Sequence, residues 1–123
     1  LGYLILGQTT ATLSGGEAQR VKLAKELMNR DKNNRLYLFD EPTVGLHQHD
    51  VLRVIKILRK LVKQGNSVIV IEHNLSVISQ SDFLIDMGIK GGNKGGEIIA
   101  NGSPKKVLKS KNSITASILR NFH

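Results

Sequence analysis

Two acidic residues, Asp40 and Glu41, directly follow a run of apolar and aromatic residues at positions 36–39. Such a run is typical of a buried strand of a parallel sheet, and Pro42 then turns the chain outward. An unpaired buried carboxylate is costly, so the acids should meet a cation, either a metal ion or a basic side chain. One interpretation is that Asp40 holds the magnesium ion of a nucleotide and Glu41 orients or deprotonates the attacking water. The other is a core strand that ends in a solvated Asp-Glu turn.

A second apolar run, residues 67–71, ends in Glu72 and His73. Residues 50–64 between the two runs have the spacing of a helix. Strand, helix and strand at this spacing predict a βαβ unit with parallel strands and a right-handed crossover. Because parallel strands end at the same edge of a sheet, the acids at 40–41 should converge with Glu72 and His73 on one crevice. Open α/β sheets bind ligands at that edge.

The intervening helix is amphipathic, with Asp50 as a possible cap at its start and Gly65 as a left-handed cap at its end. Its apolar face is predicted to carry Val51, Ile55, Leu58 and Val62, flanked by Val54 and Leu61. The opposite face is basic and carries Arg53, Lys56, Lys60 and Lys63.

A helix is also predicted upstream, where Ser14 and Glu17 fit a capping box and helical spacing continues to about Asn29. Gly15 and Gly16 leave the backbone N–H groups of its first turn exposed, which suits binding of a phosphate group. Its apolar residues recur every three or four positions, as Ala18, Val21, Ala24, Leu27 and Met28.

The remainder of the chain predicts only short elements. Residues 91–96 are rich in glycine, but a strand follows them and no Lys-Ser or Lys-Thr pair closes them, so we interpret them as a flexible turn rather than a phosphate loop. The predicted elements are a helix over 74–80, strands over 83–87 and 97–100 (the second antiparallel or at an edge), a helix beginning at Ser103 and Pro104, and a final helix over 113–120.

Composition limits the possible classes of protein. The length of 123 residues suits one domain with a modest core, and the start at Leu1 suggests a piece of a longer protein. No apolar run approaches the roughly 18 residues that cross a membrane. The beginning has no features of a signal peptide, so we expect a cytoplasmic protein without membrane contacts. The chain has no cysteine, which excludes disulfides and thiolate zinc sites within it.

The chain is basic, with 18 Lys and Arg against 10 Asp and Glu and a formal charge of +8. Such a charge permits contact with DNA or RNA, although on composition alone a solvated helix face is the better explanation. Ten of the bases fall in two stretches without acids: Arg53, Lys56, Arg59, Lys60 and Lys63, then Lys105, Lys106, Lys109, Lys111 and Arg120.

Four segments resemble, in order, motifs of the ATP-binding-cassette ATPases. Residues 13–20 resemble the signature loop, 36–41 the Walker B strand and 44–47 the D-loop, and His73 resembles the switch histidine. Their variants, Leu-Ser-Gly-Gly-Glu-Ala-Gln-Arg, Gly-Leu-His and Ile-Glu-His-Asn, are similar to the C-terminal cassette of the UvrA family, the damage-recognising ATPases of bacterial nucleotide excision repair. Segments near both ends extend the resemblance over nearly the whole chain, from residue 1 to the C-terminal strands and helices of residues 83–123. It departs from the family around positions 89–94, and at Ile5 and Thr9.

The resemblance implies a fold, cofactors and roles. The fold is an α/β, parallel-sheet nucleotide-binding domain of the ABC type, in its C-terminal portion only, because no Walker A sequence occurs here. The cofactors are ATP and Mg²⁺; zinc belongs to the parent protein, with no zinc site in this chain. Ser14, Gly15, Gly16 and Glu17 would contact the ATP of the opposite cassette. Asp40 would hold magnesium through water, with Glu41 and His73 as catalytic residues.

The resemblance also implies partners: the other cassette of the same polypeptide, a second copy of the parent protein, DNA and other excision-repair subunits. By itself the chain is expected neither to bind ATP tightly nor to hydrolyse it. Two alternatives remain, an ATPase subunit of a transporter or a translation factor, and a nucleic-acid-binding module without catalysis. His47 could make a D-loop contact across the cassette interface, whereas a metal pair with His49 lacks a third ligand. Gln19 and Arg20 would face the partner cassette or be plain polar positions.

Overall fold

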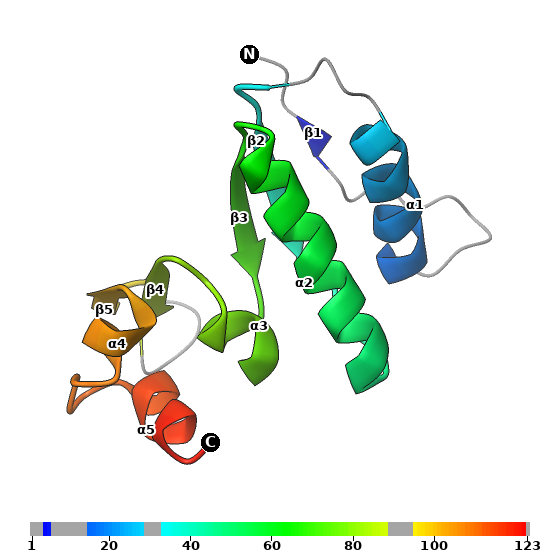
Figure 1. Cartoon of the computed structure of the whole chain (residues 1–123). Helices are drawn as coiled ribbons and strands as arrows, with labels where there is room; N and C mark the ends of the chain where they lie inside the picture. Colours follow the sequence, from blue (N-terminus) through cyan, green and yellow to red (C-terminus); the bar gives the residue numbers. More distant parts are fainter. Residues whose placement is uncertain (1–3, 6–14, 29–32, 89–94, 123) are drawn as a thin grey trace. The chain divides into compact units, whose positions relative to one another are not determined.

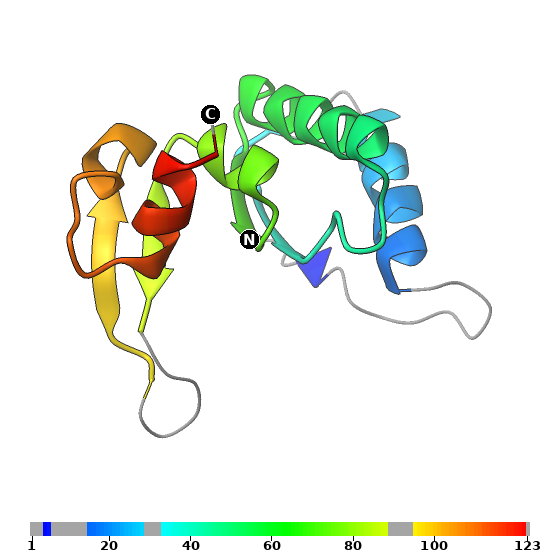
Figure 2. The ribbon, with the colours of Figure 1, turned by 90° about the horizontal axis from the view of Figure 1, so that it is seen from below.

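The computed structural model describes residues 4–5, 15–28, 33–88 and 95–122 of the chain. They form two compact units, residues 1–73 and 74–123, which Figures 1 and 2 draw from two directions. The division falls directly after His73, so the signature loop, the Walker B strand, the D-loop and the switch histidine all belong to the first unit.

The first unit is built on a three-stranded parallel sheet in the order β1-β2-β3. Strand β2 pairs with β3 from Leu36 opposite Ser67 to Asp40 opposite Ile71. The helix that connects them is α2, and α1 packs beside it (Figure 1). The predicted βαβ unit is confirmed. Its elements are β1 (Leu4–Ile5), α1 (Gly15–Met28), β2 (Leu36–Asp40), α2 (Gln48–Lys63) and β3 (Ser67–Ile71).

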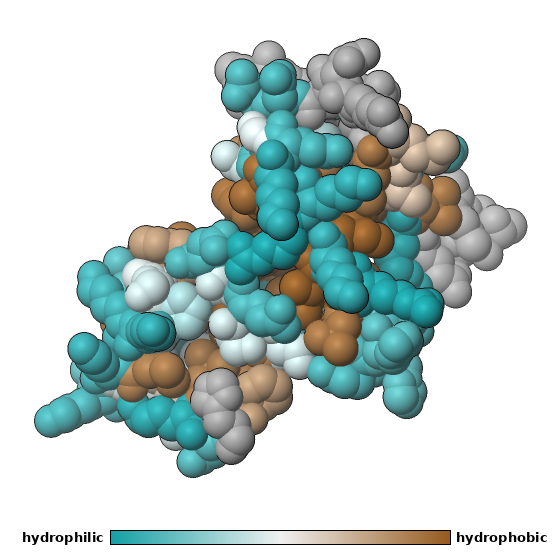
Figure 3. Space-filling view, viewed as in Figure 1, coloured by the Kyte–Doolittle hydropathy of each residue, from teal (hydrophilic) through white to brown (hydrophobic). Residues whose placement is uncertain are grey.

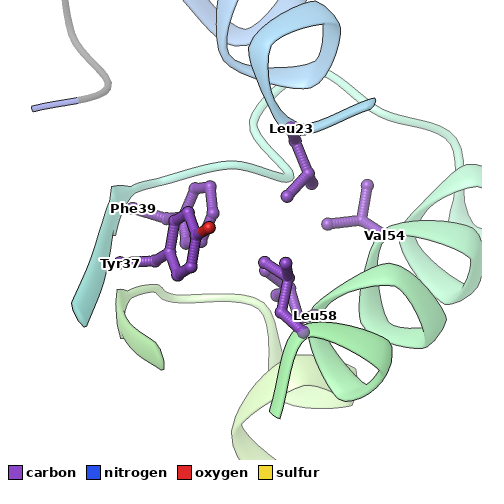
Figure 4. Close-up of a cluster of buried hydrophobic side chains, with 6 residues drawn as sticks. Leu23, Tyr37, Phe39, Val54 and Leu58 are labelled. Carbon is purple, nitrogen blue, oxygen red and sulfur yellow. The ribbon is translucent and has the colours of Figure 1, made fainter. Parts of the chain in front are cut away.

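The core of this unit lies between the sheet and the two helices. Figure 4 shows Leu23 of α1, the two rings of β2, and Val54 and Leu58 of α2 directed toward one another. The rings of Tyr37 and Phe39 are stacked, with centroids 6.2 Å apart and an interplanar angle of 9°. Both aromatic residues are almost completely buried, which makes them the principal anchors of β2.

The opposite face of the sheet is open to solvent. Leu36 and Leu38 are 44% and 45% exposed, and Ile69 and Ile71 are similarly exposed. Residues 36–39 were expected to form a buried strand. Strand β2 is buried on the face of Tyr37 and Phe39 only, so this expectation was wrong for its other face. Side chains alternate between the two faces of a strand, and the described helices of this unit contact only the face of Tyr37 and Phe39.

Helix α2 begins two residues earlier than its sequence pattern predicts. His47 is the N-cap residue and makes no side-chain capping bond. The predicted cap, Asp50, instead lies in the first turn and accepts a hydrogen bond of 3.4 Å from Nη1 of Arg53. At the other end Gly65 has φ +86°, which confirms the left-handed cap.

The buried face of α2 matches the predicted one except at Val62, which is 39% exposed; the buried residues are Val51, Val54, Ile55, Leu58 and Leu61. The buried face of α1 differs from the predicted one. In α1, Leu23 is buried whereas Val21 is 47% and Met28 83% exposed. Apolar residues occur on more than one side of α1, and the contact with the aromatic pair of β2 decides which side is buried.

A buried asparagine ties the end of α2 to the start of β2. The side chain of Asn66 accepts a hydrogen bond from the N–H of Arg35 at 3.1 Å and donates one to the carbonyl of Leu61 at 3.0 Å. The N–H of Ser67 in turn donates to the carbonyl of Arg35. These bonds hold the beginnings of β2 and β3 level with each other, and so align their far ends.

The second unit is an antiparallel pair of strands with three short helices, as predicted. The side-chain oxygens of Asn74, Ser103 and Ser113 each accept a backbone N–H at the start of a helix. Of the glycine-rich segment 91–96, residues 91–94 lie outside the described residues. The elements are α3 (Leu75–Ser79), β4 (Leu84–Met87), β5 (Ile98–Gly102), α4 (Pro104–Val107) and α5 (Ile114–Arg120).

Polar contacts join the sheet of the second unit to its last helix. The carboxylate of Asp86 on β4 accepts hydrogen bonds from the hydroxyls of Ser113 (2.5 Å) and Thr115 (2.9 Å), at the start of α5. Arg120 at the end of α5 donates to the carbonyl of Leu108 at 2.6 Å. Both ends of α5 are thereby fixed.

Candidate functional site

The carboxyl ends of β2 and β3 lie side by side, and the chain makes a tight corner after β2. The N–H of Glu41 donates to the carbonyl of Ile71 at 2.8 Å, which continues the ladder one residue beyond Asp40. Glu41 then adopts φ +46°, a left-handed conformation that is unusual for a residue other than glycine. The N–H of Val44 closes the turn by donating to the carbonyl of Glu41 at 3.1 Å.

This corner brings Glu41 to the switch histidine. Oε1 of Glu41 lies 3.0 Å from Nε2 of His73, and both side chains face solvent, 43% and 85% exposed respectively. The predicted convergence of these residues at one sheet edge is confirmed. An exposed pair of this kind contributes little to stability, so the two groups remain available to a ligand.

Asp40 presents an open carboxylate beside this pair. The residue is exposed, and no described residue donates a hydrogen bond to its side chain. Its backbone carbonyl accepts a hydrogen bond of 2.8 Å from Nε2 of Gln19 on α1. Mg²⁺ at nucleotide sites is held by one or two carboxylates together with phosphates and water, and Asp40 fits such a role.

Gln19 is therefore more than a plain polar position, because it ties α1 to the corner after β2. Oε1 of Gln19 and Nη1 of Arg20 are buried atoms without a hydrogen-bond partner among the described residues. Contact of either side chain with a partner cassette stays a prediction.

Glu72 also shapes the site, and sequence reasoning gave it no role. Its Oε1 accepts hydrogen bonds from the N–H (2.9 Å) and the hydroxyl (2.5 Å) of Thr43. Its Oε2 accepts the N–H of His73 at 3.0 Å. The only sequence signal was an acid at a strand end. Its partner Thr43 lies 29 residues earlier and is brought to it by the register of β2 against β3 and by the turn at Glu41.

The signature and D-loop residues are described only in part. Ser14 lies outside the described residues, and Gly15, Gly16 and Glu17 form the first turn of α1. In the D-loop, Gly45 has φ +72° and Val44 is 60% exposed. Contacts of these residues with a nucleotide or a second cassette therefore stay predictions.

The remaining histidines do not form a metal site with other described residues. His47 and His49 are both exposed, and the described part of the chain contains no group of three or more potential metal ligands. None of the described helices has the length and apolar character needed to span a membrane. With no cysteine in the sequence, a thiolate zinc site cannot form from this chain alone.

Comparison with known proteins gives consistent results. The family model described as ABC transporter matches residues 3–44. The chain is 57% identical to UvrABC system protein A of Rhizobium meliloti over 98% of its own length and 12% of that relative. It is 52% identical to UvrABC system protein A of Aquifex aeolicus over 99% of its length and 13% of that relative. The crystal structure of UvrA2 from Deinococcus radiodurans superposes with a TM-score of 0.83 and 47% identity, over 89% of this chain and 13% of that one.

The parallel sheet, the family match and the structural match define the class: the fold is that of an ABC-type nucleotide-binding domain, in a portion without a Walker A sequence. Within that class, the similarity over nearly the whole chain is to UvrABC system protein A, and the resemblance to the UvrA family is confirmed. The chain spans only about an eighth of the length of these relatives.

Proposed function

We propose that this chain is the C-terminal part of an ATPase cassette that couples ATP binding and hydrolysis to recognition of DNA damage in excision repair. The observation that carries the proposal is the contact of 3.0 Å between Glu41 and His73 at a shared edge of two parallel strands. It occurs in a chain 52–57% identical to UvrABC system protein A.

Each residue at the edge has a proposed task. Asp40 holds the magnesium ion of the nucleotide through water, and that ion supplies neutralisation of phosphate charge. Glu41 orients the attacking water and accepts its proton. His73 contacts the γ-phosphate from the neighbouring strand end, next to Glu41. Because both side chains are exposed to solvent, a substrate can reach them.

The first turn of α1 serves a second nucleotide in this proposal. Backbone N–H groups at a helix start attract a phosphate group, and Ser14, Gly15, Gly16 and Glu17 would offer them to ATP held by the opposite cassette. The chain would thus contribute to two ATP sites. It holds no Walker A loop, so alone it should neither bind ATP tightly nor hydrolyse it. Micromolar Mg-ATP binding by the isolated chain in a calorimetric titration would contradict this.

The whole protein is proposed to contain a second cassette in the same polypeptide, to form a homodimer and to act with DNA and other excision-repair subunits in the cytoplasm. Zinc would bind elsewhere in that protein. The alternative of a transporter or translation-factor ATPase is disfavoured because similarity to UvrABC system protein A covers 98–99% of the chain. Knowing the residues that precede Leu1 would separate the two: cysteine pairs between a Walker A loop and the signature loop favour repair.

The alternative of a nucleic-acid-binding module rests on the basic face of α2. Lys56, Lys60 and Lys63 are exposed there, and Figure 3 shows hydrophilic residues along this helix with hydrophobic surface between them. If the alternative holds, replacing all three lysines with Glu abolishes DNA binding by the chain alone. If the chain alone binds no DNA, or binds it unchanged after the replacement, the alternative is wrong.

The main test uses the complete ATPase. Wild-type protein should hydrolyse ATP in a Mg²⁺-dependent reaction, and damaged DNA should change the rate. Glu41→Gln should remove hydrolysis and keep ATP binding, because an amide accepts no proton from water but occupies the same volume. If Glu41→Gln hydrolyses ATP at the wild-type rate, the assignment of this edge as the catalytic site is wrong.

A further inference from the structure

One carboxylate joins the two segments that carry the proposed catalytic residues. Glu72 accepts both donors of Thr43 on one oxygen and the N–H of His73 on the other. We propose that Glu72 is a positioning residue for hydrolysis, which holds the corner after β2 against the switch histidine so that the Glu41–His73 contact is formed in advance. This inference rests on the proposed function of the same site.

The backbone around Glu41 depends on these bonds. Glu41 is held on one side by its N–H bond to Ile71 and, two residues later, by the bonds of Thr43 to Glu72. Both anchors belong to consecutive residues at the end of β3. Between them Glu41 has φ +46°, a conformation that costs free energy and persists only where the surroundings impose it. Loss of the Thr43 anchor would let the corner relax and move the Glu41 carboxylate.

The histidine side of the contact depends on the same group. The N–H of His73 donates to Oε2 of Glu72, while the His73 ring is 85% exposed and has few other restraints. Thr43, in contrast, is only 5% exposed. Glu72 therefore links a buried residue to an exposed one.

The donor pattern requires a carboxylate. The bonds from Thr43 and His73 each bring a hydrogen atom toward Glu72, and an ionised carboxylate offers acceptors on both oxygens and no donor. Glutamine has nearly the same shape, but one of its two positions is an NH₂ donor. In either orientation it would face the N–H of Thr43 or the N–H of His73 with another donor. Glu72→Gln should thus break one half of the link and keep the volume.

The experiment measures ATP hydrolysis and nucleotide binding by the complete ATPase carrying Glu72→Gln, Thr43→Val or Thr43→Ser. We expect Glu72→Gln to lower kcat about 10-fold to 100-fold and to change KM and the dissociation constant of Mg-ATP less than about 3-fold, because a misplaced catalytic group acts on the transition state. Thr43→Val, which loses one donor, should lower kcat less. Thr43→Ser keeps both donors and should retain most of the activity that Thr43→Val loses.

A double variant gives a second readout. Glu72→Gln with Thr43→Val should lose less activity than the two single losses combined, because residues that act through one contact are not additive. Additive losses would mean that the two residues act separately and would overturn the proposal. So would unchanged kcat in Glu72→Gln, or equal losses of kcat and nucleotide binding.

Controls separate this inference from the proposed function. If Glu41→Gln removes hydrolysis and Glu72→Gln does not, only the positioning role of Glu72 is wrong. If Glu41→Gln leaves hydrolysis intact, the proposed catalytic site itself is wrong. If Glu72→Gln does not fold, the comparison of Thr43→Val with Thr43→Ser decides: equal kcat in these two variants overturns the proposal.

Discussion

Two strands of this chain each carry an aspartate near the carboxyl end, and the two aspartates have opposite environments. Asp40 ends β2 of the first unit, is exposed, and receives no hydrogen bond on its side chain from any described residue. Asp86 lies on β4 of the second unit, is partly buried, and accepts hydrogen bonds from Ser113 and Thr115. The first carboxylate is open to a ligand, and the second is occupied in holding a helix.

The difference follows from strand direction. In the parallel pair, β2 and β3 end at the same edge, and the Glu41–His73 contact forms there. In the antiparallel pair, the end of β4 meets the start of β5, and Asp86 turns to α5 instead. An acid near a strand end is thus no sufficient sign of catalysis. The role of such a carboxylate depends on two things. One is whether nearby donors already bond to it, and the other is how many strands end at the same edge of the sheet.

The largest expected effect is on ATP hydrolysis at the open edge, the shared end of β2 and β3 that carries Asp40, Glu41 and His73. Glu41→Gln in the complete ATPase should lower kcat about 10²-fold to 10⁴-fold, the usual contribution of a general base. Steady-state ATP hydrolysis measures this, with Asp86→Asn as the matched change of acid to amide in the second unit. If Asp86→Asn lowers kcat as much as Glu41→Gln, the contrast between the open and the occupied acid is wrong.

The next effect is on stability and compares the two faces of β2. Phe39→Ala should lower the unfolding free energy by about 3–5 kcal/mol, because it leaves a cavity beside Tyr37. Leu38→Ala, on the 45% exposed face, should cost much less in the isolated chain. Hydrogen exchange of the amides of β2 and β3 measures both. Equal losses of protection would show that the second face is also packed.

A smaller effect is expected at the occupied acid. Asp86→Ala leaves the hydroxyls of Ser113 and Thr115 without their acceptor and should cost about 1–3 kcal/mol, confined to the second unit. Hydrogen exchange of residues 84–87 and 114–120 should increase while that of β2 and β3 stays the same. Faster exchange in β2 and β3 would contradict independent stabilisation of the two units.

The smallest effect is expected for the link between α1 and the corner. Gln19→Leu removes the hydrogen bond to the carbonyl of Asp40 and should cost about 1 kcal/mol of local stability. The exchange rate of the Glu41 amide measures it, and Lys25→Gln on the exposed side of the same helix is the control. No change in that rate would mean that α1 does not support the open edge.

The sequence by itself determined the order of helices and strands from α1 onward, the parallel pairing of β2 with β3 and the edge at which Glu41 meets His73, but it did not predict β1. Those features follow from local periodicity and from the geometry of a βαβ connection, which needs no knowledge of distant contacts. The helix caps at Asn74, Ser103 and Ser113 were predictable for the same reason, since each cap bonds residues two or three positions away.

Only the tertiary structure decided which side of α1 is buried, that β2 is covered on one face, and that Glu72 bonds to Thr43. Leu23 of α1 packs against a strand that is distant in sequence, and the competing apolar residues of α1 give no local preference. The bond between Glu72 and Thr43 spans 29 positions and depends on the register of β2 against β3 and on the left-handed turn at Glu41. Side-chain contacts of this kind are set by three-dimensional proximity, which spacing along the chain does not encode.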